Sequence, residues 1–381
     1  MKNLQTKLYN RLNHMHLFEL TKTLMAIPSV SGYEEAVGLW LRDHLTSLGW
    51  QAETQPVGMP TPSSAIAGSS GESDGEDSFG PQRPSLRTGA SAFGQNNVIA
   101  TLNDTPRVWF STHMDTVPPF IPPTEDGDKI YGRGACDAKG IIAAQITAAE
   151  ELRREGVEDI GLLFTVDEER SSTGAKAANI LPIAAKCKYL INGEPTDNDL
   201  AIGSKGAYRF KIKTVGKAAH SAYPEEGESA IESLLDILED VRNTRFPNDE
   251  FFGETTCNIG VIEGGLALNV IPPQAEAGLL IRLTTPPNVI RQALENVMRD
   301  RGEIEELSYS LPVKMTPVEG FKQKIVRFTT DIPHLTNWGR PLLLGPGSIL
   351  VAHTKDEFVL KRDLERAVEL YVGIAMKLLA T

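Results

Sequence analysis

The 381-residue chain contains little cysteine and no long apolar run. Its three cysteines, Cys136, Cys187 and Cys257, are too few and too widely spaced to build a disulfide scaffold, and their odd number is typical of a reducing compartment. No apolar run reaches the roughly 18 residues that a membrane-spanning helix requires. Residues 1–20 also lack the apolar core and the small-residue cleavage site of a secretory signal. We therefore expect a soluble cytoplasmic protein.

Positively charged residues are also fewer than negatively charged ones. Lys and Arg number 38 against 50 Asp and Glu, which gives a net charge of −12 and a pI near 5.2. Because affinity for phosphate comes from clustered Lys and Arg, this balance argues against a nucleic-acid partner and against docking on an anionic membrane. Hydrophobic residues make up 41% of the chain and charged residues 23%, as in ordinary globular proteins. The length suits two or three domains.

Residues 58–95 lack the apolar periodicity of helices and strands. Of these 38 residues, 7 are Gly, 8 are Ser and 4 are Pro. Such a composition cannot bury enough apolar surface to fold, so we predict a mobile surface insertion. The alternative is an ordered loop or an active-site lid, since long loops are sometimes functional.

The rest of the chain alternates between strand and helix patterns. Apolar runs at 107–111, 160–166 and 188–191 predict buried strands, and 138–153 predicts a helix between the first two. This alternation is typical of a mostly parallel sheet covered by helices. A Ser-x-x-Glu capping box at Ser31 and Glu34 predicts the start of an earlier helix.

From Gly206 the pattern changes to half-exposed strands. Strand-like segments and two helical segments follow in the order β-α-β-β-α-β, which is that of a ferredoxin-like module. The first pattern then returns and ends in a helix at 360–379. We therefore predict an α/β fold, with a mostly parallel-sheet domain formed by 1–203 and 314–381. An α+β domain, 204–313, is inserted into it.

Acidic and histidine side chains follow successive strands of the predicted sheet. His113, Glu168, Glu169 and Glu194 come directly after three buried strands, and Asp137 precedes a helix. Ligands bind outside the carboxyl ends of parallel strands, so we expect these side chains to converge. Carboxylates gathered with His need positive charge, and mixed His and carboxylate ligands suit a catalytic zinc or a dimetal hydrolytic site. The alternative is a set of ordinary loop-end acids and a surface histidine.

Neighbouring residues refine this hypothesis. Asp115, two residues after His113, is placed to accept a hydrogen bond from the histidine's other ring nitrogen and so fix its tautomer. Glu168 and Glu169 are adjacent and cannot both serve a metal in the same way. One of them can be a ligand while the other takes a proton from water as general base.

The chain resembles the dizinc amidohydrolase and metallopeptidase family of acetylornithine deacetylase, succinyl-diaminopimelate desuccinylase, aminoacylase and glutamate-releasing carboxypeptidase. The likeness covers nearly the whole chain except 58–95. The segments that carry it are STHMDTVPP (111–119), YGRGACDAKG (131–140), TVDEERSSTGA (165–175), NGEPTD (192–197), GKAAHSAYPEEGESAI (216–231), GGLALNVIPPQAEA (264–277) and GPGSILVAHTKDEF (345–358).

The resemblance implies two divalent metal ions per chain, zinc or cobalt. It implies that Asp137 bridges both ions, that His113 and Glu194 complete one site, and that Glu169 and His353 complete the other. Glu168 resembles the general base. His353 is identified by the resemblance alone, because nothing around it in the sequence distinguishes it from a surface histidine.

The inserted domain resembles a dimerisation or lid domain, which implies a homodimer. His220 resembles a residue that reaches the partner's active site and hydrogen-bonds the developing oxyanion. Asn269 and Arg282 resemble groups that bind the substrate's carboxylate, and Gly347 resembles a backbone contact to substrate. Relatives commonly have Asp two residues before this Arg, whereas this chain has Leu280.

The function implied is hydrolysis of an amide bond in a small-molecule N-acyl amino acid by metal-activated water and a Glu base. The segments at 111–119 and 131–140 most resemble the deacetylases of acetylornithine or acetyllysine. A succinyl-diaminopimelate desuccinylase and a carboxypeptidase or dipeptidase are the alternatives. A non-catalytic relative that binds acyl amino acids would have lost ligands or the base, and all of these positions are occupied here.

Overall fold

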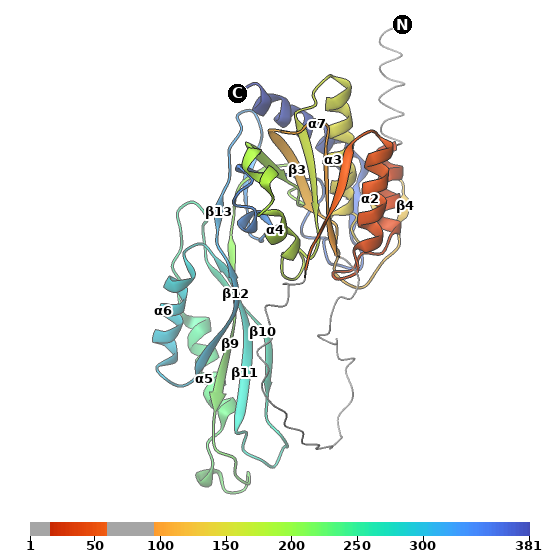
Figure 1. The fold of residues 1–381 in the computed structure, drawn as a ribbon. Coiled ribbons are helices and arrows are strands. Elements are labelled where there is room, and N and C mark those ends of the chain that lie inside the picture. Colours follow the sequence, from red (N-terminus) through yellow and green to blue (C-terminus); the bar gives the residue numbers. More distant parts are fainter. Residues whose placement is uncertain (1–15, 59–94) are drawn as a thin grey trace, which may run out of the picture.

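The computed structural model describes residues 16–58 and 95–381 (Figure 1). The predicted mobile insertion lies almost wholly outside these residues and stays a prediction. The described residues form a larger and a smaller β-sheet, with a short third sheet of β16 (Phe358–Leu360), β5 (Lys129–Tyr131) and β4 (Thr124–Asp126). Among the described helices, none has the length and apolar character needed to cross a bilayer.

The larger sheet has the order β1-β2-β6-β3-β7-β15-β8-β13, with β14 paired to β8. Its middle pairs, β6–β3, β3–β7 and β7–β15, are parallel, whereas β1, β2 and β13 join antiparallel at the edges. Its strands are β1 (Gln51–Pro56), β2 (Asn96–Thr101), β3 (Val108–His113), β6 (Ile160–Thr165), β7 (Tyr189–Asn192), β8 (Leu200–Ser204), β13 (Val313–Lys314), β14 (Gln323–Val326) and β15 (Arg340–Leu343).

Helices cover both faces of this sheet. Along β3, Phe110 joins the core under one helical layer and Trp109 joins the core under the other, because neighbouring strand residues point to opposite faces. The first layer contains a helix over 16–26, α2 (Glu35–Ser47), α3 (Lys139–Arg154) and α7 (Lys361–Leu379), and the second contains α4 (Thr173–Ala178), η1 (Pro182–Lys186) and η3 (Ile332–His334). Burial on both faces explains the unbroken apolar runs of the middle strands.

The smaller sheet has the order β10-β11-β9-β12 and is antiparallel throughout. A separate apolar core packs two helices against one face. Its elements are β9 (Gly206–Val215), η2 (Pro224–Glu226), α5 (Ala230–Asn243), β10 (Thr256–Gly264), β11 (Gln274–Leu283), α6 (Pro287–Met298) and β12 (Glu303–Ser310). The predicted fold class, a mostly parallel α/β sheet with a ferredoxin-like insertion, is therefore confirmed.

The smaller sheet extends away from the larger one (Figure 1). Only Lys205 separates β8 from β9, and the chain returns through Leu311 and Pro312 between β12 and β13. The residues on either side of this excursion, Ser204 and Val313, are directly paired in the larger sheet. The division into 1–203, 204–313 and 314–381 remains our proposal.

The predicted capping box is wrong. Helix α2 begins at Glu35, and its N-cap Glu34 makes no side-chain capping bond. The Ser31 hydroxyl instead donates to Asp115 Oδ2 at 2.7 Å, and Glu34 accepts from the Gly32 amide. A buried carboxylate from a distant strand end is the stronger acceptor for Ser31, because hydrogen bonds to ionised groups exceed neutral ones.

Candidate dimetal site

The site forms where the parallel strands β3, β6 and β7 end. His113 is the last residue of β3, Glu168 and Glu169 lie in the turn after β6, and Glu194 lies two residues after β7. Asp137 stands just before α3. The register pairs His113 with Thr165 of β6, so these ends lie side by side as the sequence predicts.

Asp137 lies at the centre of the cluster. Its Oδ1 is 2.9 Å from His113 Nε2, and its Oδ2 is 3.1 Å from His353 Nε2. The two oxygens of one carboxylate therefore face two different histidines. This arrangement fits a carboxylate that bridges two ions.

A further carboxylate accompanies each histidine. Glu194 Oε1 lies 4.0 Å from His113 Nε2, and Glu169 Oε1 lies 2.9 Å from His353 Nε2. His353 has a positive φ of 65° in an exposed turn, and its side chain is 47% exposed. The five side chains thus divide into two groups that share Asp137. The structure brings together all five predicted ligands.

The buried carboxylates of the cluster favour the binding of cations. Burial raises the pKa of Glu168 and of Glu194 well above the ordinary carboxyl range. For Asp137, burial acts in the same direction, but hydrogen bonds to His113 and His353 outweigh it and lower its pKa. Hydrogen bonds to Asp137 and Glu169 raise the pKa of His353 to about 10. In the metal-free protein, the buried carboxylates are thus stabilised by protonated histidines. Metal ions can supply this positive charge instead.

The donor set fits divalent metal. Ligand atoms of His113, Asp137 and Glu169 lie within 4.8 Å of one another. Imidazole nitrogen and carboxylate oxygen are ligands of catalytic zinc, and paired ions in such sites lie roughly 3.5–4 Å apart. The cluster can therefore hold two ions in adjacent positions.

Asp115 orients its neighbours from beneath the cluster. It is fully buried and accepts hydrogen bonds from the backbone amides of Glu168, at 3.0 Å, and Glu169, at 3.1 Å. His113 Nδ1 lies 3.0 Å from the Asp115 carbonyl oxygen and 3.4 Å from its Oδ1. The hydrogen bond of His113 Nδ1 thus goes to the Asp115 backbone carbonyl, with the predicted carboxylate acceptor 3.4 Å away, while the carboxylate itself holds the turn that carries both glutamates.

One acidic residue near Glu168, Asp331, was not predicted from the sequence. Asp331 is buried at the start of η3, and its Oδ2 accepts from Thr165 Oγ1 at 2.7 Å. Burial raises the pKa of Asp331 to about 6, and its charge contributes to the raised pKa of Glu168. Asp331 follows no predicted strand, so the reasoning that found the other acids does not reach it.

Gly347 lies against the site. Its φ is 78°, and a Cβ at this position would stand 2.5 Å from the Cβ of Cys136, the neighbour of Asp137. A side chain here would therefore collide with the segment that carries Asp137. Gly347 is thus brought to the edge of the cluster, with its backbone free of a side chain.

Two residues predicted on the inserted domain, His220 and Asn269, are not brought to the cluster. The segments 216–229 and 265–273 lie at the end of the smaller sheet away from the larger one (Figure 1). Within them, His220 bridges to Val270, and the Ser221 amide donates to the Asn269 carbonyl. His220 and Asn269 are both exposed. The loops of these two residues therefore lie side by side.

Arg282 is near the opposite end of β11, where it pairs with Ala207. Burial, and then neighbouring Arg209, lower the pKa of Arg282. Neither arginine has an ion pair or hydrogen bond among residues 16–58 and 95–381, and Leu280 lies directly across from Arg209. Position 280 is Leu here, where the family resemblance implies Asp. The Arg282 guanidinium therefore has no carboxylate beside it in the described part of the chain and is available to an anion.

Comparison with known proteins gives a consistent result. Residues 109–377 match peptidase family M20/M25/M40. A peptidase M20 domain-containing protein of Schizosaccharomyces pombe is 36% identical over 368 residues, which cover 95% of this chain and 84% of the relative. A protein named probable carboxypeptidase from Aspergillus terreus is 36% identical over 385 residues, covering 92% and 83%.

Solved structures show the same fold at lower identity. A tripeptidase from Staphylococcus aureus has a TM-score of 0.71 and 19% identity, with 95% of this chain and 99% of that chain covered. Human carnosine dipeptidase 1 has a TM-score of 0.68 and 16% identity, with 97% of each chain covered.

Proposed function

Because the chain belongs to peptidase family M20/M25/M40, we propose that this metallopeptidase-like hydrolase is a carboxypeptidase that uses two metal ions. The observation that carries the proposal is Asp137, whose two carboxylate oxygens face His113 and His353. Relatives at 36% and 34% identity are named probable carboxypeptidases, which favours this activity over the acetylornithine or acetyllysine deacetylase that the sequence suggested first.

In the proposed site, Asp137 would hold both ions, His113 and Glu194 one of them, and Glu169 and His353 the other. Bound there, the ions supply a Lewis acid for the scissile carbonyl and lower the pKa of the attacking water. The donor chemistry suits zinc or cobalt.

Glu168 is the proposed general base. Its carboxylate takes a proton from the attacking water and returns it to the leaving amine nitrogen. The buried Asp115 holds the backbone amides of Glu168 and Glu169, which keeps the base next to a ligand. Arg282 and Asn269 are the proposed partners of the substrate's terminal carboxylate, and Gly347 provides a backbone contact.

We further propose a homodimer, formed through the inserted domain, in which His220 of a second copy completes the site. His220 is exposed and belongs to the segment 216–229, at the end of the smaller sheet away from the larger one, so it needs a second chain or a large movement to reach the ions. The outer strand β10 of the smaller sheet exposes Val261 and Ile262, each by 55%. An exposed apolar edge strand is a ready pairing surface. A mass near 41.6 kDa in solution would contradict the dimer.

The proposal also places the enzyme in the cytoplasm. Its support is that Cys136, Cys187 and Cys257 are all free thiols, which is typical of a reducing compartment.

The experiment is a comparison of substrates with the zinc- or cobalt-loaded enzyme. The panel contains an N-blocked dipeptide, its carboxyl-terminal amide, a free dipeptide, a tripeptide, acetylornithine, acetyllysine and succinyl-diaminopimelate. We expect the highest kcat/KM for a peptide with a free carboxyl terminus and a large loss on amidation. Faster turnover of acetylornithine, or equal turnover of the amide, would overturn the carboxypeptidase assignment.

A further inference from the structure

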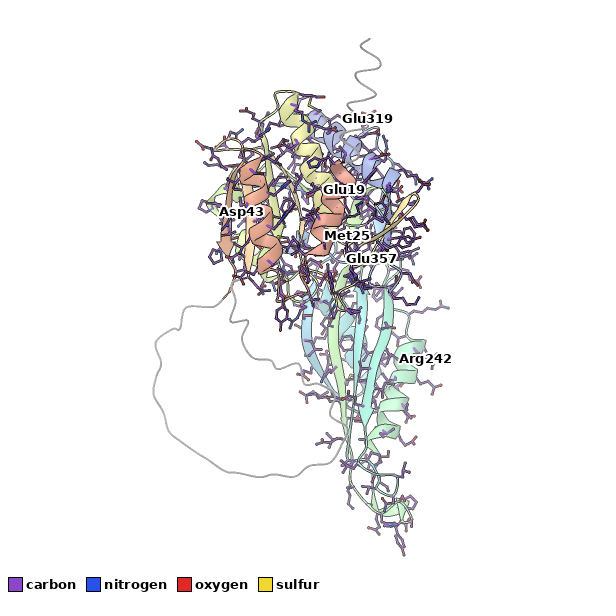
Figure 2. The ribbon with its side chains drawn as sticks, turned by 90° about the vertical axis from the view of Figure 1, so that its right-hand side faces the viewer. Glu19, Met25, Asp43, Arg242, Glu319 and Glu357 are labelled. Carbon is purple, nitrogen blue, oxygen red and sulfur yellow. The ribbon has the colours of Figure 1, made fainter. Side chains whose placement is uncertain are left out.

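A buried ion pair lies beside the cluster and is not used by the proposed chemistry. Arg133 Nη1 is 2.6 Å from Glu357 Oε2, and the two side chains are 2% and 0% exposed. Figure 2 labels Glu357, which lies at the end of the larger domain nearer the smaller sheet. The partners are 224 positions apart in the chain. The pair therefore joins two distant segments in the interior.

Glu357 holds the segment that carries Asp137. Its Oε1 accepts hydrogen bonds from three backbone amides, those of Gly134 at 2.9 Å and of Cys136 and Asp137 at 3.3 Å each. The Gly132 amide also donates to the Glu357 carbonyl at 3.0 Å. One carboxylate oxygen thus fixes the backbone immediately before α3, and with it the position of the Asp137 side chain.

Arg133 holds the segment that carries His353. Its Nη1 donates to the Thr354 carbonyl at 3.2 Å, and its Nη2 donates to the His353 carbonyl at 3.5 Å. The guanidinium has donors in a fixed planar fork, so a single Arg can bind the Glu357 carboxylate and these carbonyls at once. The ion pair therefore links the backbones of two predicted ligands of the same ion.

Stability alone explains this pair poorly. Moving two charges out of water costs several kcal/mol per ion, and replacement of a buried ion pair by apolar residues is often neutral or stabilising. The pair also leaves the buried Nε of Arg133 without a partner. The contribution of the pair to the structure is its hydrogen bonds to the backbones of Asp137 and His353.

We propose that Arg133 and Glu357 are positioning residues, which set the separation of Asp137 and His353 and thereby the affinity of the metal position that they share with Glu169. The inference rests on the metal ligands given under Proposed function. It assigns the pair no contact with substrate and no proton transfer.

The test measures metal affinity of the purified full-length protein after chelation. Zinc is titrated in competition with a chromogenic chelator, for the wild type, Glu357→Gln and Arg133→Lys. Glu357→Gln keeps the size of the side chain but removes its charge, and Arg133→Lys keeps the charge but removes the fork. Changes around metal ligands typically cost 10–100-fold, so we expect the weaker zinc dissociation constant to rise about 10–100-fold in both variants. At saturating zinc, kcat recovers and KM stays unchanged.

The control is Asp159→Asn, in an Arg–carboxylate pair whose side chains are more exposed, at 37% and 27%. Asp159 also pairs with an Arg, Arg107, and accepts from that residue's backbone amide at 2.6 Å, in the same domain but away from the ligands. This variant should keep the wild-type zinc affinity.

Wild-type zinc affinity in folded Glu357→Gln, or in folded Arg133→Lys if Glu357→Gln does not fold, would overturn the positioning role. An equal loss of affinity in Asp159→Asn would also overturn it, because general destabilisation would then explain the result. A wild-type protein that binds no second zinc would instead overturn the proposed function itself.

Discussion

The two parts of the candidate site differ in how firmly they are held. In the larger domain, Asp137 and Glu194 are buried, and the Asp137 carboxylate lies within hydrogen-bonding distance of two histidines. On the smaller sheet, His220 and Asn269 are exposed, and Arg282 has no charged partner among the described residues. Most of the metal-binding part is organised by burial, whereas in the other part His220 and Asn269 are exposed and Arg282 is half-buried.

This difference separates two tasks. A site for small cations must hold its ligands to a fraction of an ångström, which the rigid strand ends, Asp115 and the Arg133–Glu357 pair provide. Groups that bind a substrate have to admit it first, so they can lie on a surface that a second copy or a domain movement completes. Substitutions in the two parts should therefore impair the enzyme in different ways.

The largest effect is expected for Glu168→Gln. Loss of a general base lowers turnover by about 100- to 10,000-fold, while the ligands of the ions remain in place. The measurements are kcat and metal content by elemental analysis. Near-full activity would remove Glu168 from its role, and a loss of metal would mean that Glu168 is a ligand.

His220→Ala should come next. Removal of one oxyanion donor costs about 100- to 1,000-fold in kcat. Because His220 is exposed, the thermal midpoint and zinc content should match those of the wild type. Mixing this variant with Glu168→Gln should restore activity if His220 acts across a dimer, since one mixed site then has both residues. Absence of recovery after subunit exchange would argue that His220 acts within its own chain.

A smaller effect, confined to binding, is expected for Arg282→Gln. A hydrogen-bonded charge contributes about 1.5–3 kcal/mol, so KM should rise about 10- to 100-fold with little change in kcat. Lys213→Gln is the control, because Lys213 extends from the neighbouring strand and is already paired with Glu305 at 2.7 Å. An unchanged KM would mean that Arg282 does not bind the substrate carboxylate.

The smallest effect is expected in the pH dependence of the thermal stability of the metal-free protein. Burial raises the folded-state pKa of Glu168 and Glu194 above the ordinary 4.5, and contacts with acids raise that of His353 to about 10. A raised folded pKa contributes stability below the unfolded value, and this stability is lost as the pH rises through the folded value.

The thermal midpoint of the chelated protein should therefore fall from about pH 5 to about pH 8, by about 2–4 °C for each kcal/mol lost. Differential scanning calorimetry measures this slope. Added zinc should flatten it, since a cation favours the charged carboxylates. A slope of opposite sign without metal would contradict the electrostatic account.

The middle of the fold was predictable because it depends on local patterns. The apolar runs at 107–111 and 160–166 correspond to β3 and β6, and their ends carry His113 and the two glutamates. The edge strand β1 was not predicted, since half-exposed antiparallel strands have no continuous apolar run.

The remaining features depend on contacts between distant residues. His353 and Asp331 belong to turns after the inserted domain, and no periodic pattern marks them. Ser31 shows how a local pattern can mislead, because its hydroxyl binds the distant Asp115 instead of capping α2. The assignment of roles to the site residues stays a prediction, which the variants above test.

The pairing of Ser204 with Val313 has a practical consequence for protein engineering. Directly opposed residues of antiparallel strands have Cα atoms about 4.5–5.5 Å apart, a gap that a two-residue hairpin turn spans. Residues 205–312 can therefore be exchanged for an Asn-Gly turn without stretching the larger sheet. The shortened chain would carry every proposed metal ligand and none of the substrate-binding groups on the smaller sheet, and so would separate metal loading from turnover in one molecule.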